Sequence, residues 1–384
     1  MYSVANYGAM IADRTRMGAF ARALEAKIAP GSVVVDLGTG TGIMALLACR
    51  FGARRVFAIE PDDAIQVGRE IAARNGCADR IDFIQAISTD TTIPEKADVI
   101  VHDIGGLMPW FHQHIPAIVD ARRRFLAPGG VLIPMRDDVW ATVVETPELY
   151  AGKTGPWEHS AFGFDMTPAR DMELNTWTRG RVNRDAFLSP PLVVATLEYA
   201  AISDPDLKAT VTWTIDRPGT GHGLVAGVNR TLADGISLSN LPDAPEDQQS
   251  DGVYETVFFP WAAPVALDAG DIVTCGINAK FMHDDYAWTW KTRVRGADGA
   301  DKTTFVQSTF FGTPLSRETV KKRGASYVPR VNAEGRIVQF ILSGMDRGLS
   351  IGEIAAGLRA EFPARFIRPQ DALSRVATFS ALYD

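Results

Sequence analysis

A glycine-rich loop between a strand and a helix is the feature that most constrains how this chain folds. Residues 33–35 are three valines, which indicate a short buried strand, and residues 36–42 read Asp-Leu-Gly-Thr-Gly-Thr-Gly. Residues 43–51 are apolar-rich, as in a helix that follows. Glycines in such a turn let the backbone approach a ligand without a side-chain clash. The pattern is typical of nucleotide-binding domains of many kinds.

Strand and helix patterns alternate from residue 1 to about 135. Helical apolar spacing is followed by short apolar runs of strand length, and this order recurs. The helices are expected at residues 10–28, 63–75 and 115–126, and the further strands at 56–59, 81–84 and 98–101. Such alternation predicts an α/β domain with a parallel, doubly wound sheet.

The secondary-structure pattern that the sequence predicts changes twice after residue 135. Residues 136–312 contain short β-rich runs separated by Gly, Pro and Asp, which predict an antiparallel β-barrel or sandwich. Residues 317–384 are helical again, with Ser350 and Glu353 spaced as a capping box and Pro369 at a helix start. Three short helices with tight turns resemble a helix-turn-helix or winged-helix domain. We therefore expect three domains, with boundaries near residues 135 and 312–317.

Composition narrows the class of protein. The formal net charge of the 384 residues is −7, which argues against a general nucleic-acid binder. The three cysteines are widely spaced and form no Cys-x-x-Cys, so neither a disulfide framework nor a zinc-thiolate site is indicated. The N-terminus lacks the layout of a signal peptide, and no apolar run approaches the roughly 18 residues that span a bilayer. We expect a cytoplasmic protein without a membrane segment.

A carboxylate at the end of the second strand sharpens the ligand prediction. Glu60 follows residues 56–59, about 20 residues past the glycine loop, where it can accept hydrogen bonds from both hydroxyls of a ribose. A dehydrogenase would offer the same residue. Two features favour a methyl donor: the loop does not have the Gly-x-Gly-x-x-Gly spacing, and Asp13 and Arg16 precede it and can meet a zwitterionic amino-acid group. The expected cofactor is S-adenosyl-L-methionine.

Several stretches together resemble the protein arginine methyltransferase family over the first 310 or so residues. Residues 10–16 resemble the family's helix that closes over the cofactor, and residues 36–42 its glycine loop. Residues 52–60 resemble the strand with the ribose-binding glutamate, and residues 126–134 the exit into the barrel. Residues 162–166 (Phe-Gly-Phe-Asp-Met) resemble the motif that opens the family's dimerisation arm.

This resemblance implies a Rossmann-like domain joined to a β-barrel and an S-adenosylmethionine-dependent methyltransferase. It also implies a head-to-tail homodimer, with an arm at about residues 167–190. Ser88 stands where the family has a glutamate near the adenine. The implied cofactor contacts are Met10, Arg16, Asp36, Gly38, Thr39, Gly40, Gly42, Glu60, Pro61, Ile87, Ser88 and His102.

The chain departs from the family in the loop after the fourth strand. There the family has two glutamates that hold the substrate guanidinium through bidentate hydrogen bonds. Here the two positions carry Asp103 and His112, and a later Thr-His-Trp motif is replaced by Asp-Gly-Val at residues 251–253. One carboxylate and one imidazole make a weaker clamp. We hypothesise that the acceptor is not arginine but a carboxylate or another peptide side chain or terminus, with Asp103 and His112 as orienting group and base.

The loop residues after the fourth strand also permit other assignments. Asp103 with His112 and His114 has the ligand types of a metal site, but i,i+2 histidines converge only in extended structure, so we expect no metal. His114 is expected to be a loop residue in a polar cleft. Trp110 and Phe111 are expected in the core. Trp288 and Trp290 alternate within one strand, which predicts that they pack inside the barrel.

The C-terminal residues 327–382 resemble PqqD-like domains. In that resemblance an extended strand at 327–331 precedes the helices, and the domain captures the leader of a ribosomally made precursor peptide by strand addition. DNA binding is the rival, because residues from Arg317 onward include eleven Lys or Arg against seven Asp or Glu. However, the expected helix at 350–362 carries only Arg359 as a base, so nucleic acid is the weaker expectation.

Three functions follow. The first is a methyltransferase that modifies a ribosomally synthesised natural-product precursor peptide, captured through its leader. The second is a protein arginine N-methyltransferase with a degenerate two-carboxylate clamp. The third is a regulator that binds the cofactor without catalysis and uses its tail on DNA or a partner protein.

Overall fold

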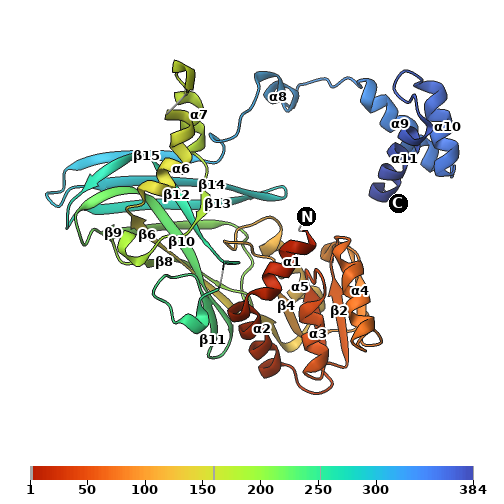
Figure 1. Cartoon of the computed structure of the whole chain (residues 1–384), viewed down its shortest axis with the longest axis horizontal. Coiled ribbons are helices and arrows are strands. Elements are labelled where there is room, and N and C mark those ends of the chain that lie inside the picture. The colour runs from red at the N-terminus through yellow and green to blue at the C-terminus, as the bar shows by residue number, and fades with distance from the viewer. Residues whose placement is uncertain (1–2, 159–160, 251, 384) are drawn as a thin grey trace. The chain divides into compact units, whose positions relative to one another are not determined.

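The computed structural model describes residues 3–158, 161–250 and 252–383 of the chain (Figure 1). The chain divides into two compact units, Met1–Pro314 and Leu315–Asp384. The first unit holds a parallel sheet with its helices and two antiparallel sheets, and the second is helical. The predicted α/β domain, antiparallel β domain and helical C-terminal region are thereby confirmed.

The parallel sheet has five strands in the order β3-β2-β1-β4-β5, and every neighbouring pair is parallel. The strands are β1 (Val33–Leu37), β2 (Arg55–Ile59), β3 (Ile81–Ile84), β4 (Ala97–His102) and β5 (Leu126–Ile133). All five residues of β1 are buried, as expected for a strand covered on both faces. The strand order reverses between β1 and β4, and ligands of such sheets bind beyond the carboxyl ends of the strands at this point.

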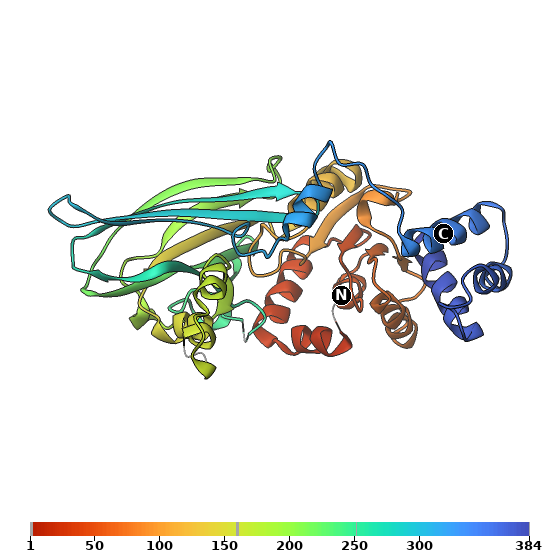
Figure 2. The same cartoon turned by 90° about the horizontal axis from the view of Figure 1, so that it is seen from above.

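Five helices belong to this domain, and Figure 2 shows them flanking the sheet. They are α1 (Val4–Ala12), α2 (Arg14–Lys27), α3 (Ile43–Arg50), α4 (Ala64–Arg74) and α5 (His114–Phe125). The helix predicted at 10–28 is interrupted at Asp13, whose carboxylate caps α2 by accepting the N–H of Arg16. The helix predicted at 115–126 is present as α5 and ends within one residue of the predicted position, while the Pro-Gly-Gly at 128–130, which we expect to follow the helix as a turn, lies within β5.

Two antiparallel sheets form the second part of the first unit. One has the order β7-β12-β10-β6-β8 with β11 paired to β10, and the other β15-β14-β13-β9. The strands are β6 (Arg136–Val144), β7 (Thr178–Gly180), β8 (Leu192–Glu198), β9 (Leu207–Thr214), β10 (Gly219–Ala233), β11 (Ile236–Ser239), β12 (Thr256–Leu267), β13 (Ile272–Met282), β14 (Asp285–Arg295) and β15 (Asp301–Ser308). Trp288 and Trp290 are buried in the core of this β domain, as predicted, and Trp110 packs edge-on against Trp288.

The hairpin of β10 and β11 connects the two parts of this unit. Leu232 and Leu238 are buried in one cluster with Phe20 and Leu24 of α2. The end of β10 therefore lies against the parallel-sheet domain. Residues on this end of β10 can consequently contribute to a site at the edge of the parallel sheet.

A helical arm leaves the β domain between β6 and β7, earlier in the chain than the arm expected at residues 167–190, because residues 178–180 already pair with β12 as β7. It contains α6 (Pro147–Glu158) and α7 (Thr167–Glu173), which Figure 1 shows projecting from the strands. Phe162 and Phe164 lie between these helices with 92% and 71% of their surface exposed. Large apolar side chains this exposed are typical of a surface that contacts another protein.

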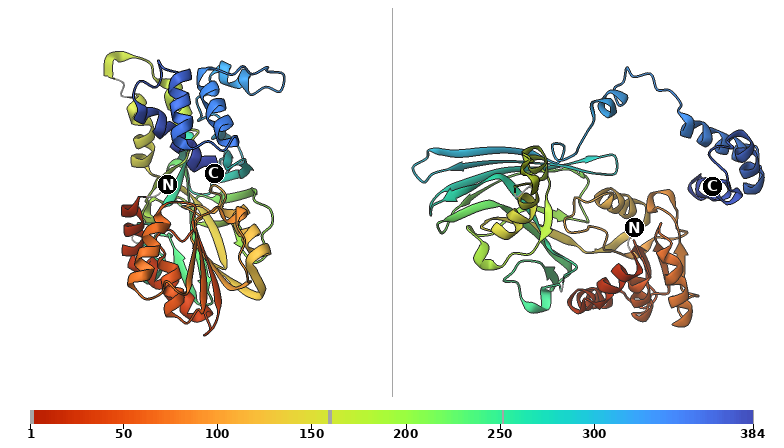
Figure 3. Two further views of the ribbon diagram at one scale, coloured as in Figure 1. Left: turned by 90° about the vertical axis from the view of Figure 1, so that its right-hand side faces the viewer. Right: turned by 45° about the horizontal axis from the view of Figure 1, so that its top comes forward.

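The described residues of the second unit form four helices, and Figure 3 shows this helical region. They are α8 (Arg317–Lys322), α9 (Ala333–Asp346), α10 (Ile351–Glu361) and α11 (Pro369–Tyr383). Ile341, Leu358 and Val376 are fully buried between the last three helices, and the predicted capping box of Ser350 with Glu353 is present. The strand expected at 327–331 is not formed, because the described residues 315–383 offer no second strand with which it could pair. None of the described helices is long and apolar enough to span a membrane.

Candidate active site

The glycine loop beyond β1 is a closely covered backbone turn. Gly38, Gly40 and Gly42 have φ angles of 76°, 53° and 86°, which side chains rarely adopt. A Cβ atom on Gly38 would lie 2.3 Å from the side chain of Ile104, and one on Gly40 would lie 2.3 Å from the ring of Tyr7. The side chains of Ile104, after β4, and Tyr7, of α1, therefore lie directly against the loop. Only glycine, which has no Cβ, fits at these two positions.

Asp36, near the end of β1, holds this loop in place through hydrogen bonds. Its Oδ2 atom accepts hydrogen bonds from the hydroxyl of Thr39 at 2.5 Å and from the N–H of Ala45 at 2.9 Å. The carboxyl group is buried, and burial raises its pKa to about 7. Asp36 thus ties the loop to the first turn of α3.

Glu60 lies at the end of β2, beside the loop. Its Oε2 accepts the N–H of Gly40 at 3.0 Å, and its Oε1 accepts the N–H of Asp62 at 3.1 Å. Burial raises the pKa of this carboxyl group. A carboxylate has about four acceptor sites, so roughly half remain for a ligand. The bare glycine backbone and these acceptors fit the adenosine part of the predicted cofactor, whose ribose offers two hydroxyl donors.

The other predicted cofactor residues differ in their hydrogen bonds and in their exposure to solvent. The carbonyl oxygen of Met10 accepts from Nη1 of Arg16 at 2.9 Å. Ser88 is buried, and its carbonyl oxygen accepts from Arg124 at 2.5 Å. Ile87 is 56% exposed, and Pro61 is also exposed.

Asp103, which follows β4, is surrounded by cations. Its Oδ2 accepts from Nε and Nη2 of Arg16 at 2.9 and 2.5 Å and from the hydroxyl of Tyr254 at 2.6 Å. Its Oδ1 accepts from Nη1 of Arg230 at 3.0 Å. Burial alone would raise the pKa of Asp103, but the two arginines outweigh it and lower the pKa. Both carboxylate oxygens of Asp103, the predicted orienting group, therefore accept hydrogen bonds from within the protein.

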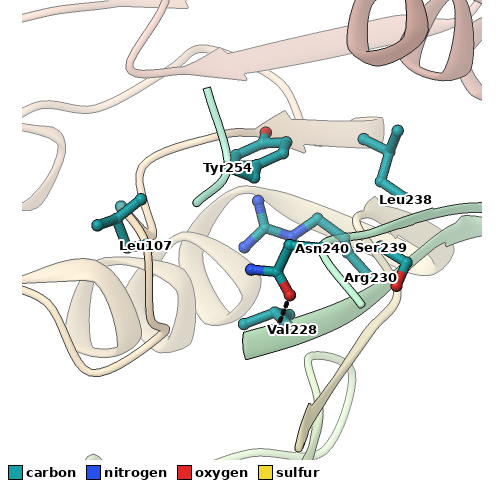
Figure 4. Close-up of a pocket in the computed structure, with 8 residues that line it drawn as sticks. Leu107, Val228, Arg230, Leu238, Ser239, Asn240 and Tyr254 are labelled. Carbon is teal, nitrogen blue, oxygen red and sulfur yellow. Dashed lines mark hydrogen bonds between the residues drawn. The ribbon is translucent and has the colours of Figure 1, made fainter. Parts of the chain in front are cut away.

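The ion-pair network continues into the β domain. Nε and Nη2 of Arg230 donate to the two carboxylate oxygens of Asp137, each at 2.9 Å. The hydroxyl of Tyr199 donates to Asp137 at 2.7 Å. Arg230 and Asp137 are direct cross-strand partners on β10 and β6. Figure 4 shows the guanidinium of Arg230 between the ring of Tyr254 and the side chain of Asn240.

His112 lies at the surface, apart from this buried network. Its side chain is 59% exposed, its N–H donates to Asp285 at 3.2 Å, and its Nδ1 is 3.8 Å from the same carboxylate. Its φ angle of 43° is unusual for a residue with a side chain. The partner of His112 in the structure is thus Asp285 of the β domain, whereas Asp103 is held by the arginines.

His102 and His114 are both buried. Their ring centroids are 5.6 Å apart, and both rings pack against Tyr199. Burial lowers the pKa of His114 to about 4 and lowers that of His102 as well, so both imidazoles are neutral at pH 7. The expectation of His114 in a polar cleft is wrong, since its Nδ1 lies 2.8 Å from the carbonyl of Pro109 in the core. Within the described residues, no group of three or more His, Cys, Asp or Glu is arranged to hold a metal.

Three residues of this site escaped sequence reasoning: Arg230, Asp137 and Tyr254. A signal for Arg230 existed, because strand residues two apart share a face and Arg230 lies between the apolar Val228 and Leu232. An arginine on a buried strand face needs a carboxylate partner, because an unpaired buried charge is strongly destabilising. Tyr254 directly follows the Asp-Gly-Val stretch at 251–253, of which Asp251 lies outside the described residues.

Comparisons with known proteins agree with this architecture. The profile of the ribosomal protein L11 methyltransferase (PrmA) family matches residues 15–135. A relative from Oryza sativa subsp. indica, "Probable protein arginine N-methyltransferase 6.1", is 28% identical over 210 residues, which cover 53% of this chain and 55% of the relative. The chain thus spans about half the length of the curated relatives it matches.

Solved structures resemble a larger part of the chain. Protein arginine methyltransferase 10 of Arabidopsis thaliana has a TM-score of 0.69 at 18% identity, covering 80% of this chain and 98% of its own. The PRMT1 enzyme-prozyme complex of Trypanosoma brucei with AdoHcy has a TM-score of 0.70 at 17% identity, with the same coverages. The expected resemblance to the arginine methyltransferases, and their fold, are confirmed.

Proposed function

We propose that this chain is an S-adenosylmethionine-dependent methyltransferase whose acceptor is a group other than arginine. When bound, the cofactor supplies an electrophilic methyl group. Glu60 accepts hydrogen bonds from the ribose hydroxyls, and the glycine loop lies against the adenosine. Arg16, which donates to the carbonyl oxygen of Met10 and to Asp103, is the proposed counter-ion of the methionine carboxylate through the N–H groups that these two acceptors leave free.

The acceptor proposal rests on the hydrogen bonds of Asp103, which occupy both of its carboxylate oxygens. A clamp for a substrate guanidinium needs free carboxylate oxygens, and here Arg16, Arg230 and Tyr254 already donate to both oxygens of Asp103. An incoming guanidinium would have to displace one of these donors and would leave a buried arginine unpaired, which costs several kcal/mol. A neutral or anionic acceptor avoids this cost.

His112 remains the base that we propose for a neutral nucleophile. Its imidazole is 59% exposed and therefore accessible to a substrate, and its Nδ1 lies 3.8 Å from the carboxylate of Asp285. A carboxylate acceptor needs no base, because it is already deprotonated at pH 7.

We further propose that the substrate is a peptide recruited by the C-terminal unit. Support comes from its separate core and its basic composition, eleven Lys or Arg against seven Asp or Glu from Arg317 onward. Because this unit has no strand among its described residues, recruitment uses its helical surface rather than strand addition. Tethering of a precursor by its leader would raise the effective concentration of a distant acceptor residue. A homodimer formed through the arm is part of the same proposal, supported by the exposed Phe162 and Phe164.

Arginine N-methylation is the second candidate, and the names of the curated relatives favour it. One experiment separates the two. Purified protein is incubated with labelled S-adenosylmethionine and two peptide pools, one of candidate precursors and one rich in Arg-Gly, and mass spectrometry locates each added methyl group. We expect the label on a non-arginine group; methylation confined to arginine would overturn the acceptor proposal.

Cofactor binding is tested in the same preparation. Glu60→Ala should weaken S-adenosylmethionine binding in calorimetry by about tenfold or more, the equivalent of a charge-assisted hydrogen bond. Glu70→Ala, a change of an exposed glutamate on α4, is the matched control and should bind normally. Equal affinities of the two variants would contradict the assignment of Glu60.

A further inference from the structure

Tyr254, which precedes β12 in the β domain, contacts three charged side chains of the buried network. Its hydroxyl donates to Oδ2 of Asp103 at 2.6 Å and accepts from Nε of Arg16 at 3.3 Å. The guanidinium of Arg230 lies 5.1 Å from the centroid of its ring (Figure 4). Burial, followed by the charge of Asp103, raises the pKa of Tyr254 above its usual range, so the hydroxyl is a donor at pH 7. This hydroxyl therefore joins the carboxylate of Asp103 to the guanidinium of Arg16.

The guanidinium of Arg16 is held by three separate parts of the chain. Its Nε and Nη2 donate to Asp103, which follows β4, and its Nε also donates to Tyr254 of the β domain. Its Nη1 donates to the carbonyl oxygen of Met10 in α1 at 2.9 Å, and to Sδ of Met17 at 3.2 Å. The Nε and Nη2 side of Arg16 is thus fixed by groups that do not belong to α1.

Helix α1, which lies against the glycine loop, is weakly held. None of its residues, Val4–Ala12, is buried, although the ring of Tyr7 is so close to Gly40 that a Cβ there would lie 2.3 Å away. Segments with few buried contacts open at a low cost in free energy. Displacement of α1 would free Nη1 of Arg16, whereas Nε and Nη2 would keep their acceptors in the other two segments. A group that enters beside the loop would then meet an arginine that is already held in place.

The role left to Arg16 is that of an oriented hydrogen-bond donor. Two arginines and two aspartates make the described network neutral, so it supplies no unpaired positive charge. The methionine end of S-adenosylmethionine is a zwitterion with one carboxylate and one ammonium group, and it needs no such charge. A donor whose orientation is fixed beforehand loses less conformational entropy on binding.

We propose that Tyr254 is a positioning residue of the cofactor site, which fixes the guanidinium of Arg16 for the methionine carboxylate of S-adenosylmethionine. The inference rests on the proposed methyltransferase function and adds a residue of the β domain to its cofactor site. Tyr254 acts through Arg16 and Asp103 rather than by contact with the cofactor. Ser250 supports it, because its hydroxyl accepts the N–H of Tyr254 at 3.3 Å and donates to Asp13, the N-cap of α2.

The test compares two ligands that share the adenosine group and the sulfur atom. S-adenosylhomocysteine carries the amino-acid group, and methylthioadenosine lacks it. Calorimetry measures both dissociation constants for full-length wild type and for Tyr254→Phe, which removes only the hydroxyl. We expect the variant to bind S-adenosylhomocysteine about tenfold more weakly, the equivalent of one hydrogen bond to a charged group, and methylthioadenosine within about twofold of wild type.

Tyr150→Phe is the matched control. The side chain of Tyr150 is also buried, and its hydroxyl donates to the carbonyl oxygen of Ala262 at 3.4 Å, in a different core cluster. The control should bind both ligands as wild type does. If Tyr254→Phe does not fold, Ser250→Ala takes its place, because it removes the hydroxyl that supports Tyr254; we expect the same selective loss, of about threefold.

The outcomes are separable. Equal losses of affinity for the two ligands, or a loss no larger than that of the control, would leave Tyr254 a purely structural role and overturn the inference. A wild type that binds S-adenosylhomocysteine no more tightly than methylthioadenosine would remove Arg16 from the methionine group, and the inference with it. Failure of wild type to bind either ligand would instead overturn the proposed function.

Discussion

A carboxylate buried between two guanidinium groups keeps its charge, and Asp103 is in this situation. Burial disfavours the charge of Asp103, but Arg16 and Arg230 outweigh it. The stability that Asp103 contributes is therefore present above the ordinary pKa of an aspartate. It is lost as the pH falls through the lowered pKa of the folded protein.

Asp103→Asn should destabilise the protein, because it leaves Arg16 and Arg230 facing a neutral group in a buried site. A loss of about 3–5 kcal/mol in the free energy of unfolding is expected from the removal of one member of a buried ion pair. Urea unfolding at pH 7 measures it. Asp301→Asn, which breaks an exposed pair with Arg293, should cost no more than about 1 kcal/mol. Similar losses in the two variants would contradict the buried network.

The pKa of Asp36 is shifted in the opposite direction from that of Asp103, so its effect on stability has the opposite pH dependence. Its pKa in the folded protein, about 7, lies above that of an unfolded aspartate, so the native state binds more protons between about pH 4 and 7. Stability should fall as the pH rises through this window, by up to about 1.4 kcal/mol per pH unit for one proton. Asp36→Asn keeps the oxygen that accepts from Thr39 and Ala45.

The measurement is urea unfolding of wild type and Asp36→Asn at pH 5, 6 and 7 without cofactor. The variant should be relatively more stable at pH 7 than at pH 5. A difference between the two proteins that stays constant with pH would show that the carboxyl group of Asp36 does not titrate in this window.

Local residue patterns predicted the cofactor loop but not the acceptor site. Asp36, the three glycines and Glu60 lie within one strand–loop–helix–strand segment, so their spacing alone indicates their proximity. Arg230 meets Asp103 across 127 positions of sequence, and only the packing of the β10–β11 hairpin on α2 brings them together. The burial of His114 was likewise set by tertiary contacts with Tyr199 rather than by its local sequence.

At the scale of elements, short strands and caps were predicted well because they depend on neighbouring residues. The break between α1 and α2 was missed, since the apolar spacing runs on across Asp13, which is the C-cap of α1 and whose carboxylate caps α2. The strand expected at 327–331 was overpredicted, since a strand needs a partner that the sequence pattern does not reveal.

The arm is the element with the clearest prediction. Phe162→Ser/Phe164→Ser should convert a wild-type dimer into a monomer, because both side chains are mostly exposed and apolar. Sedimentation velocity measures the mass. Val193→Ser/Val306→Ser removes exposed apolar side chains from β8 and β15 instead and should leave the dimer intact. A dimer that survives the loss of both phenylalanines would contradict the role of the arm.

At the scale of the whole molecule, the chain combines two units with opposite charge. The formal net charge of the complete chain is −7, whereas residues from Arg317 onward carry an excess of four positive charges. Each unit has its own buried core, so the first unit is expected to fold without the second. In the proposed function, the methyl transfer belongs to the first unit and substrate recruitment to the second.

Truncation after Pro314 should therefore raise the KM for a leader-bearing precursor by about tenfold or more, while kcat and S-adenosylhomocysteine affinity stay unchanged. The same truncation should not alter the KM for a short peptide that contains only the acceptor. An unchanged KM for the full precursor would mean that the second unit plays no part in substrate recruitment.

The most direct test of the whole account is the chemical stability of the transferred methyl group. Protein, S-adenosylmethionine with a radiolabelled methyl group, and peptides containing both glutamate and arginine are incubated together, and the product is then treated with mild base. Methyl esters release volatile methanol under these conditions, whereas methylated guanidinium groups are stable. The account predicts that the label becomes volatile; label that stays on the peptide and maps to arginine would contradict it.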